Sequence, residues 1–334
     1  MKTILIVVYF GRPPVYFPLF LKSCSMNPDI VWLLVGDCFE EQELSENVRT
    51  LHMEFSEFQQ LVRDRLDADY EVCSVSKICD YKPAFGYLFE DRIREFNWWG
   101  YCDLDQIFGQ LKPWIEDPQL QTKQKLFCLG HLTLYKNTEE NNRLFMNSLN
   151  GDCPYQRVFR KRKCTGFDEW SGESINEICL ANEIPAEYST PGADIDPYRT
   201  AFSILNFDVQ TRTYSSSLEN VIFHWKNGTL TGLYLENGKL QEQEFPYVHL
   251  QKRKMKVLPA AYSGCSFYIV PNRFVVEEAG MDPEKLITLS GRRRMLNTQY
   301  FKVKWKSLQQ RIRTGNWNFR HIQVERRKKR REKE

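Results

Sequence analysis

The sequence predicts an α/β fold built on a mixed, mainly parallel sheet, followed by a late β-meander and a basic helical C-terminal tail. Residues 3–10 and 30–35 are short, apolar and rich in β-branched side chains, as buried strands are. A short helical stretch between them indicates a β–α–β unit, in which the strands pair in parallel. Asn-Gly pairs at 227–228 and 237–238 divide residues 221–245 into three strand-like runs, which predicts a meander with two tight turns.

The middle of the chain continues this alternation of helices and strands. Residues 54–66 and 83–96 place apolar side chains at helical spacing, and Pro83 suits the first position of a helix. Residues 126–135 have the composition of a further strand. The stretch from 150 to 200 is irregular and rich in Gly, Pro, Asp and Cys, which is typical of a substrate loop.

Length and composition restrict the class of protein. The chain has 334 residues, of which 42% are hydrophobic and 14% aromatic, so a sizeable core can form and global disorder is excluded. No apolar run approaches the roughly eighteen residues that span a bilayer, and the start shows no secretory leader pattern. The ten cysteines include no C-x-x-C pair, which favours free thiols in a reducing compartment. We expect a cytoplasmic protein, soluble or peripheral on the inner face of the membrane.

The charge is distributed unevenly along the chain. Residues 291–334 carry 16 Lys and Arg against 3 Asp and Glu, so an acidic body bears a strongly basic tail. Phe301, Trp305, Leu308 and Ile312 recur at helical spacing among these cations. Such a basic amphipathic helix binds an anionic membrane surface or packs on the catalytic domain, and the pattern leaves both open.

The strongest chemical signal is the pair Asp103 and Asp105, which follows an aromatic strand-like run at 98–102. Two carboxylates at the carboxyl end of a parallel strand lie where open α/β sheets bind ligands. Their hard oxygens suit Mg²⁺ or Mn²⁺ shared with a diphosphate. The alternative is a pair of solvated turn aspartates. The apolar residues on both sides favour a place near the core, where unpaired negative charge is costly.

Two further segments carry groups suited to a nucleotide. Asp80 and Lys82 precede a predicted helix, where a lysine can hold phosphate and Asp80 can bind a ribose or order Lys82. The alternative is a helix cap with a surface lysine. Tyr9, Gly11 and Arg12 follow the first strand, where they can stack on a nucleobase and approach a ribose, or form the aromatic edge of the core.

The later part of the chain supplies candidates for metal binding and proton transfer. His249 lies on a short strand, where it serves as a third Mn²⁺ ligand or as a structural histidine, and Lys252 beyond it can hold phosphate. Asp168 and Glu169 are candidate general bases for an acceptor hydroxyl, or an exposed acidic pair. His131 is a weaker candidate for recognition of the donor sugar.

These motifs together carry a family resemblance. In combination they resemble a bacterial family of glycosyltransferase-like proteins found with capsular and exopolysaccharide biosynthesis genes, and more broadly the A-type nucleotide-diphospho-sugar transferase fold. The resemblance implies that Asp103, Asp105 and the late His249 bind metal or donor, and that Asp168 or Glu169 is the base. It covers roughly residues 1–255 and rests on segments 77–86, 99–109, 130–137, 167–170 and 247–253.

The resemblance also implies a domain organisation and a function. We expect a catalytic domain over 1–255, with a nucleotide-sugar-binding half at 1–125 and an acceptor half at 126–255, then a connecting segment at 256–290 and the basic tail at 291–334. The predicted reaction is metal-dependent transfer of a hexosyl group from a nucleotide-sugar, with a UDP-sugar the expected donor. The acceptor would be a glycan or a lipid-linked acceptor in polysaccharide biosynthesis.

Two alternatives remain from the sequence. A sugar-phosphate or nucleotidyl transferase uses the same kind of metal site and differs in its products. A non-enzymatic nucleic-acid-binding protein would act through the basic tail, but the acidic body disfavours nucleic acid as a partner.

Overall fold

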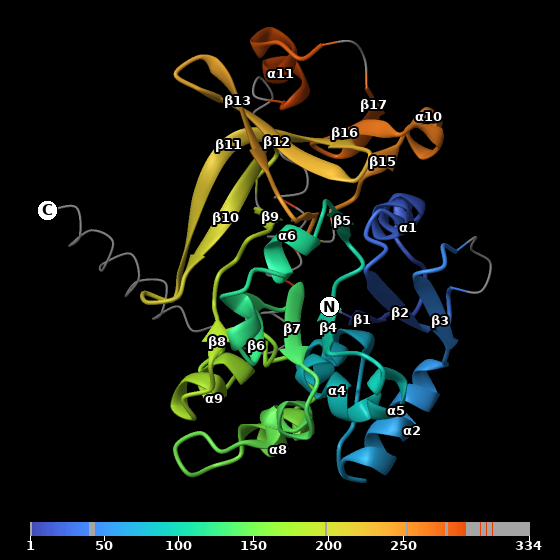
Figure 1. Ribbon diagram of the computed structural model, residues 1–334, viewed down its shortest axis with the longest axis vertical. Coiled ribbons are helices and arrows are strands. Elements are labelled where there is room, and N and C mark those ends of the chain that lie inside the picture. The colour runs from blue at the N-terminus through green and yellow to red at the C-terminus, as the bar shows by residue number, and fades with distance from the viewer. Residues whose placement is uncertain are drawn as a thin grey trace, which may run out of the picture.

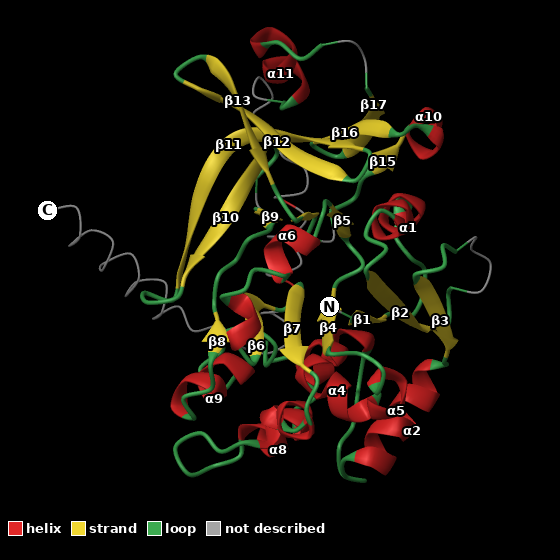
Figure 2. Cartoon of the chain, viewed as in Figure 1, coloured by secondary structure: helices red, strands yellow, loops and turns green. Residues whose placement is uncertain are grey.

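Two sheets form the framework of the molecule, one lower and one upper in Figure 1. Figure 2 shows that most helices gather around the lower sheet, whereas the upper region is built mainly of strands. The computed structural model describes residues 2–39, 44–197, 199–251, 253–277 and 280–291, together with Phe301, Trp305 and Gln309.

Seven strands make the first, lower sheet, and parallel pairing predominates in it. Only β7 is antiparallel to its neighbours, β4 and β6. This mixed, mainly parallel sheet with helices on its faces confirms the predicted α/β class. In spatial order the strands are β3 (Val48–His52), β2 (Ile30–Gly36), β1 (Thr3–Val8), β4 (Trp98–Cys102), β7 (Leu132–Lys136), β6 (Lys125–Leu129) and β8 (Ala186–Glu187).

The second sheet contains the predicted meander. Its turns are formed by Asn227 and Asn237, whose φ angles of 48° and 51° lie in the left-handed region that Asn-Gly turns require. The path runs through β15 (Lys256–Val257), β17 (Arg273–Val276), β16 (Ser266–Val270), β11 (Thr213–Lys226), β10 (Phe202–Asp208), β9 (Ala193–Ile195), β14 (Tyr247–His249) and β5 (Gln106–Phe108). Off this path, β12 (Thr229–Glu236) pairs with β11, and β13 (Lys239–Glu244) pairs with β12.

The helices are short, and the longest, α2, begins with a capping box between Glu54 and Glu57. They are α1 (Phe17–Ser25), α2 (Phe55–Arg65), α3 (Ile78–Tyr81), α4 (Phe85–Leu88), α5 (Glu90–Ile93), α6 (Lys112–Ile115), α7 (Glu139–Asn142), α8 (Pro154–Arg160), α9 (Ile175–Ala181), α10 (Pro259–Ser263) and α11 (Pro283–Leu289), with 3₁₀ turns η1 (Val75–Lys77), η2 (Lys82–Ala84), η3 (Leu120–Thr122) and η4 (Leu144–Met146).

Several elements differ from the sequence-based expectations. Residues 126–135 form the hairpin β6–β7 and not a single strand. The chain turns at Gly130, which packs closely against Asp168. The helix expected over 83–96 is divided into η2, α4 and α5. The irregular stretch at 150–200 contains α8, α9, β8 and β9. Residues 256–290 were expected to form a connecting segment. The structure places β15, β16 and β17 of this segment in the second sheet.

The first sheet is buried on both faces, which explains why its strands are continuously apolar. Along β1, Ile4 and Ile6 enter the cluster that α2, α4 and α9 cover, whereas Leu5 and Val7 enter a cluster shared with α1 and the second sheet. All ten cysteines are free thiols, and four of them are buried. None of the helices in the described ranges has the length and apolar character needed to cross a bilayer.

Most of the basic tail lies outside the described residues, including Leu308 and Ile312 of the predicted apolar stripe. Phe301 and Trp305 are described, and their side chains are exposed.

Gly86 allows α4 to pack directly on β4, the strand that leads into Asp103. A Cβ added at Gly86 would lie 2.3 Å from the ring of Trp99, which is fully buried and stacked 4.6 Å from Tyr135. We expect Gly86→Ala to lower the free energy of unfolding by about 1–3 kcal/mol through overpacking, measured by urea denaturation. Leu180→Ala, at an exposed position on α9, is the control and should change it by less than about 0.5 kcal/mol. An unchanged midpoint for Gly86→Ala would contradict this packing.

Candidate functional site

Asp103 and Asp105 lie in the three-residue crossing from β4 to β5, at the carboxyl ends of the parallel strands. His249 of β14 faces them: its Nε2 is 3.3 Å from Asp105 Oδ1 and 3.7 Å from Asp103 Oδ2. The antiparallel pairing of β14 with β5 brings these segments together. One ligand atom from each of the three residues lies within 4.8 Å of the other two, which is close enough to hold one metal ion.

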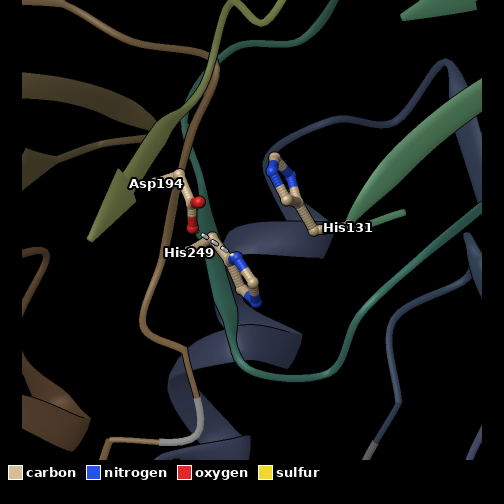
Figure 3. Close-up of side chains that lie close together, drawn as sticks. All are labelled: His131, Asp194 and His249. Carbon is tan, nitrogen blue, oxygen red and sulfur yellow. Dashed lines mark hydrogen bonds and ion pairs between the residues drawn. The ribbon is translucent and has the colours of Figure 1, made fainter. Parts of the chain in front are cut away.

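The orientation of His249 is fixed from its other side by Asp194. Figure 3 shows the contact, in which His249 Nδ1 and Asp194 Oδ1 are 2.8 Å apart. Gln251 Nε2 also donates to Asp194, at 2.7 and 3.0 Å from its two oxygens. With Nδ1 donating to Asp194, Nε2 is directed at Asp103 and Asp105. This is the arrangement of a metal-binding histidine held by a carboxylate.

The protonation of His249 follows from the surrounding carboxylates. Burial alone would lower the pKa of His249, but the charges of Asp105 and Asp194 outweigh burial and raise that pKa well above its ordinary value. Burial would raise the pKa of Asp194, but its hydrogen bond to His249 lowers it. Without a metal, the imidazolium therefore supplies the positive charge that the carboxylates need.

His131 stands beside His249 with the rings 4.6 Å apart. Its Nδ1 is 2.9 Å from the Tyr247 hydroxyl, and its buried Nε2 has no hydrogen-bond partner among the described residues. Burial and the neighbouring His249 lower the pKa of His131 to about 4, so it is neutral. His131, Asp194 and His249 form a second group with metal-binding spacing, but it shares His249 with the first.

Lys82 is a buried cation that joins Asp103 to the loop between α8 and α9, residues 161–174, which we call the acceptor loop because it lies in the predicted acceptor half. Its Nζ donates to Asp103 Oδ1 at 2.6 Å and to the Gly130 carbonyl at 2.9 Å, and lies 3.3 Å from Asp168 Oδ2. Burial would lower the pKa of Lys82, but Asp103 above all raises it well above its ordinary value. The sequence leaves Lys82 as a phosphate ligand or a surface lysine at a helix cap. The structure buries its side chain and pairs its ammonium group with protein partners, so it is not a surface lysine, and its role as a phosphate ligand stays a prediction.

Asp80 is fully buried and is bonded to Lys77 and to the acceptor loop. It accepts hydrogen bonds from Lys77 Nζ at 2.7 Å, from the backbone of Thr165 at 2.9 and 3.0 Å, and from the Phe167 N–H at 3.0 Å. The expected contact with a ribose does not fit a carboxylate enclosed in this way. The geometry makes Asp80 the anchor of the loop that presents Asp168.

The two candidate bases differ in their surroundings. Asp168 is buried and paired with Lys82, whereas Glu169 is half-buried, and its Oε1 accepts from the Gly130 N–H at 3.2 Å. Burial raises the pKa of both carboxyl groups, against the opposing charge of Lys82. A Cβ at Gly130 would lie 2.2 Å from Asp168 Oδ2, so this close approach requires glycine.

The first loop lies at the same edge of the sheet as Asp103. The Tyr9 hydroxyl donates to the Arg12 carbonyl at 3.2 Å, and the Gly11 N–H donates to Asp37 Oδ1 at 2.8 Å. The exposed Arg12 and half-buried Tyr9 stay candidates for the nucleotide. Lys252 lies outside the described residues.

Sequence reasoning missed Asp194, Gln251 and Asp37 as partners of the site. Asp37 directly follows β2, so the rule that ligands bind at the carboxyl ends of parallel strands could have found it. Asp194 lies on a three-residue strand in the irregular stretch and carries no local signal.

The fold and this geometry define an α/β protein with an acidic, histidine-containing candidate metal centre at the carboxyl edge of a mainly parallel sheet. The chain belongs to DUF6625, a family of unknown function, which it matches over residues 5–278. No curated protein matches it.

Solved structures similar to this chain include two glycosyltransferases. One is the galactosyltransferase LgtC in complex with donor and acceptor sugar analogs, at 10% identity and TM-score 0.37 over 58% of this chain and 75% of that one. Another is mouse xyloside xylosyltransferase 1 in its apo form, at 9% identity and TM-score 0.38 over 58% of this chain and 87% of that one. At these values the likeness transfers neither residue roles nor activity.

Substitution of Asp80 tests whether its buried ion pair with Lys77 and its backbone hydrogen bonds anchor the acceptor loop. Asp80→Asn leaves the Lys77 charge buried without its counter-ion and weakens the hydrogen bonds to Thr165 and Phe167. We expect the free energy of unfolding to fall by about 3–5 kcal/mol, measured by guanidinium denaturation. Asp64→Asn, an exposed change on α2, is the matched control and should have little effect. Equal stability of the two variants would contradict the anchoring role.

Proposed function

We propose that the protein is a metal-dependent glycosyltransferase that moves a hexosyl group from a nucleoside-diphosphate sugar to a glycan or lipid-linked acceptor. The observation that carries the proposal is the convergence of Asp103, Asp105 and His249 at the carboxyl edge of the sheet. A nucleotide-diphosphate ligand fits such an edge, and its negative charge requires a cation. A UDP-sugar is the donor we would test first.

The donor set fits Mn²⁺ or Mg²⁺, and the imidazole favours Mn²⁺ because Mg²⁺ prefers oxygen ligands. When bound, such an ion neutralises the charge that develops on the departing diphosphate. Asp103, Asp105 and His249 would hold it. Asp194 keeps His249 Nε2 directed at the ion's position, and Lys82 keeps Asp103 in place.

Glu169 is the better placed base for the acceptor. Its half-buried carboxylate is free of an ion pair with Lys82, whereas Asp168 is held by that cation. The acceptor oxygen attacks the anomeric carbon, the bond from that carbon to the diphosphate breaks, and Glu169 takes the acceptor proton. A direct displacement of this kind inverts the anomeric configuration.

The nucleoside would lie against the first loop, where Tyr9, Gly11 and Arg12 border the same edge. Lys252 remains a proposed phosphate ligand. We also propose a role in polysaccharide biosynthesis at the cytoplasmic face of the membrane. The exposed side chains of Phe301 and Trp305 support shallow insertion by the basic tail.

The first experiment measures release of nucleoside diphosphate from a panel of nucleotide-sugars with Mn²⁺ or Mg²⁺. We expect one donor to be hydrolysed only with metal, and Asp105→Asn and Asp103→Asn to lower turnover by at least about 100-fold, because each removes a charged ligand. Asp91→Asn, an exposed change on α5, is the control. Release of nucleoside monophosphate or pyrophosphate would instead favour the sugar-phosphate or nucleotidyl transferase. Metal-independent turnover would contradict the proposed centre.

The proposed base generates a pH dependence. Because burial raises the pKa of Glu169 and the base must be deprotonated, kcat/KM should fall on acidification at a pH above roughly 4.3, the ordinary glutamate value. Glu169→Gln should lower kcat by about 100- to 10,000-fold and remove this acid limb. Glu169→Asp should retain the limb with reduced rate. A pH profile that is unchanged in Glu169→Gln would exclude this residue as the base.

A further inference from the structure

The hairpin of β10 and β11 extends one face of the second sheet away from the candidate metal centre. His249 on β14 pairs with Asp194 on β9, Asp194 pairs with Leu205 on β10, and Leu205 pairs with Ser216 on β11. Side chains of residues directly across a sheet point to the same face. A continuous row therefore runs from His249 to the exposed Ser216.

Tyr214 continues this row two residues beyond Ser216, opposite Phe207. Its ring packs 4.9 Å from that of Phe207, and 51% of its side chain remains exposed. Burial above all, together with the charges of Glu169 and Asp194, raises the pKa of Tyr214. Phe207 also stacks on Trp170, the residue after Glu169, so the face ends in an exposed aromatic ring near the loop that carries the proposed base.

The turn end of the hairpin, around Phe207 and Arg212, packs against the loop that carries the proposed base. Trp170, the residue after that base, stacks 5.8 Å from Phe207, and the Arg212 guanidinium lies 3.8 Å from the centre of the Trp170 ring. Arg212 also pairs with Glu177 of α9 at 2.9 Å. Figure 1 shows β10 and β11 running from the upper sheet down toward the lower one. These contacts fix Tyr214 relative to the acceptor loop.

We propose that this face of the hairpin is the acceptor subsite and that it binds the terminal pyranose ring of a glycan against Tyr214. The inference rests on the proposed function and names the chemistry of its acceptor. A pyranose presents axial C–H groups on one face and hydroxyls around its edge. Tyr214 supplies an aromatic surface for the C–H face, and Ser216 and Glu169 supply polar partners for the edge.

The charges around the subsite restrict which sugar it takes. Glu169 immediately precedes Trp170, whose ring stacks on Phe207 opposite Tyr214, so its negative charge lies at this end of the hairpin and would repel an anionic ring. The nearby cation Arg212 is already paired with Glu177. The subsite therefore fits an uncharged hexose or N-acetylhexosamine better than a uronic acid or a sialic acid. That ring is common to a free glycan and to a glycolipid, so the test must include both.

The experiment compares glycan binding by the full-length protein and four variants, with UDP and Mn²⁺ present. Tyr214→Ala removes the aromatic surface and Tyr214→Phe keeps it. Ser216→Trp fills the subsite, whereas Ser215→Trp adds the same bulk on the opposite face of the same strand. Binding is measured on an array of neutral and acidic oligosaccharides and to matching glycolipids in phosphatidylcholine vesicles. Thermal unfolding verifies the fold of each variant.

We expect the wild type to bind neutral glycans, Tyr214→Ala to bind about tenfold more weakly, and Ser216→Trp to lose binding. Tyr214→Phe and Ser215→Trp should bind as the wild type does. A preference for vesicle-borne sugars would identify a lipid-linked acceptor, and equal binding a free glycan. If the wild type hydrolyses a donor but binds no glycan, or if Tyr214→Ala and Ser216→Trp bind normally, the subsite is overturned while the transferase remains. Absence of donor hydrolysis would instead overturn the proposed function.

Discussion

The site depends on a buried ammonium group between two carboxylates. Lys82 pairs with Asp103, which belongs to the candidate metal-binding pair, and with Asp168, which belongs to the acceptor loop. Removing Lys82 would leave the buried Asp168 carboxylate without its counter-ion, which is far more costly than loss of a surface ion pair. The same contact that neutralises Asp103 therefore sets the distance between the metal centre and the proposed base.

A second buried ion pair holds the same loop. Asp80 pairs with Lys77 and accepts hydrogen bonds from the backbone N–H groups of Thr165 and Phe167, which anchors the loop whose Asp168 contacts Lys82. Gly130 completes the contact, since only a residue without Cβ lets Asp168 approach the β6–β7 turn. Local backbone geometry and long-range charge pairing thus specify the same arrangement.

The sequence predicted the parts of the fold and of the candidate site that have local signatures. Asp103 and Asp105 follow an apolar strand, and the Asn-Gly turns of the meander require left-handed backbone at Asn227 and Asn237. Asp194 could not be predicted from the sequence because its strand has only three residues. Its place beside His249 depends on the pairing of β9 with β14, which lies more than fifty residues later in the chain. The role of Asp80 could not be predicted for the same reason: apart from Lys77, its partners lie far along the chain and are mostly backbone N–H groups, whose positions no sequence pattern records.

The crossing from β4 to β5 joins the two sheets at the candidate metal centre. β4 belongs to the first sheet and β5 to the second, so Asp103 and Asp105 lie where the two sheets are joined by three residues. The second sheet brings His249 and Asp194 to that junction and continues into the hairpin that carries Tyr214. Strands β11, β10, β9 and β14 are paired in one sheet, so the proposed acceptor subsite at Tyr214 and the candidate metal centre at His249 share a single hydrogen-bonded framework.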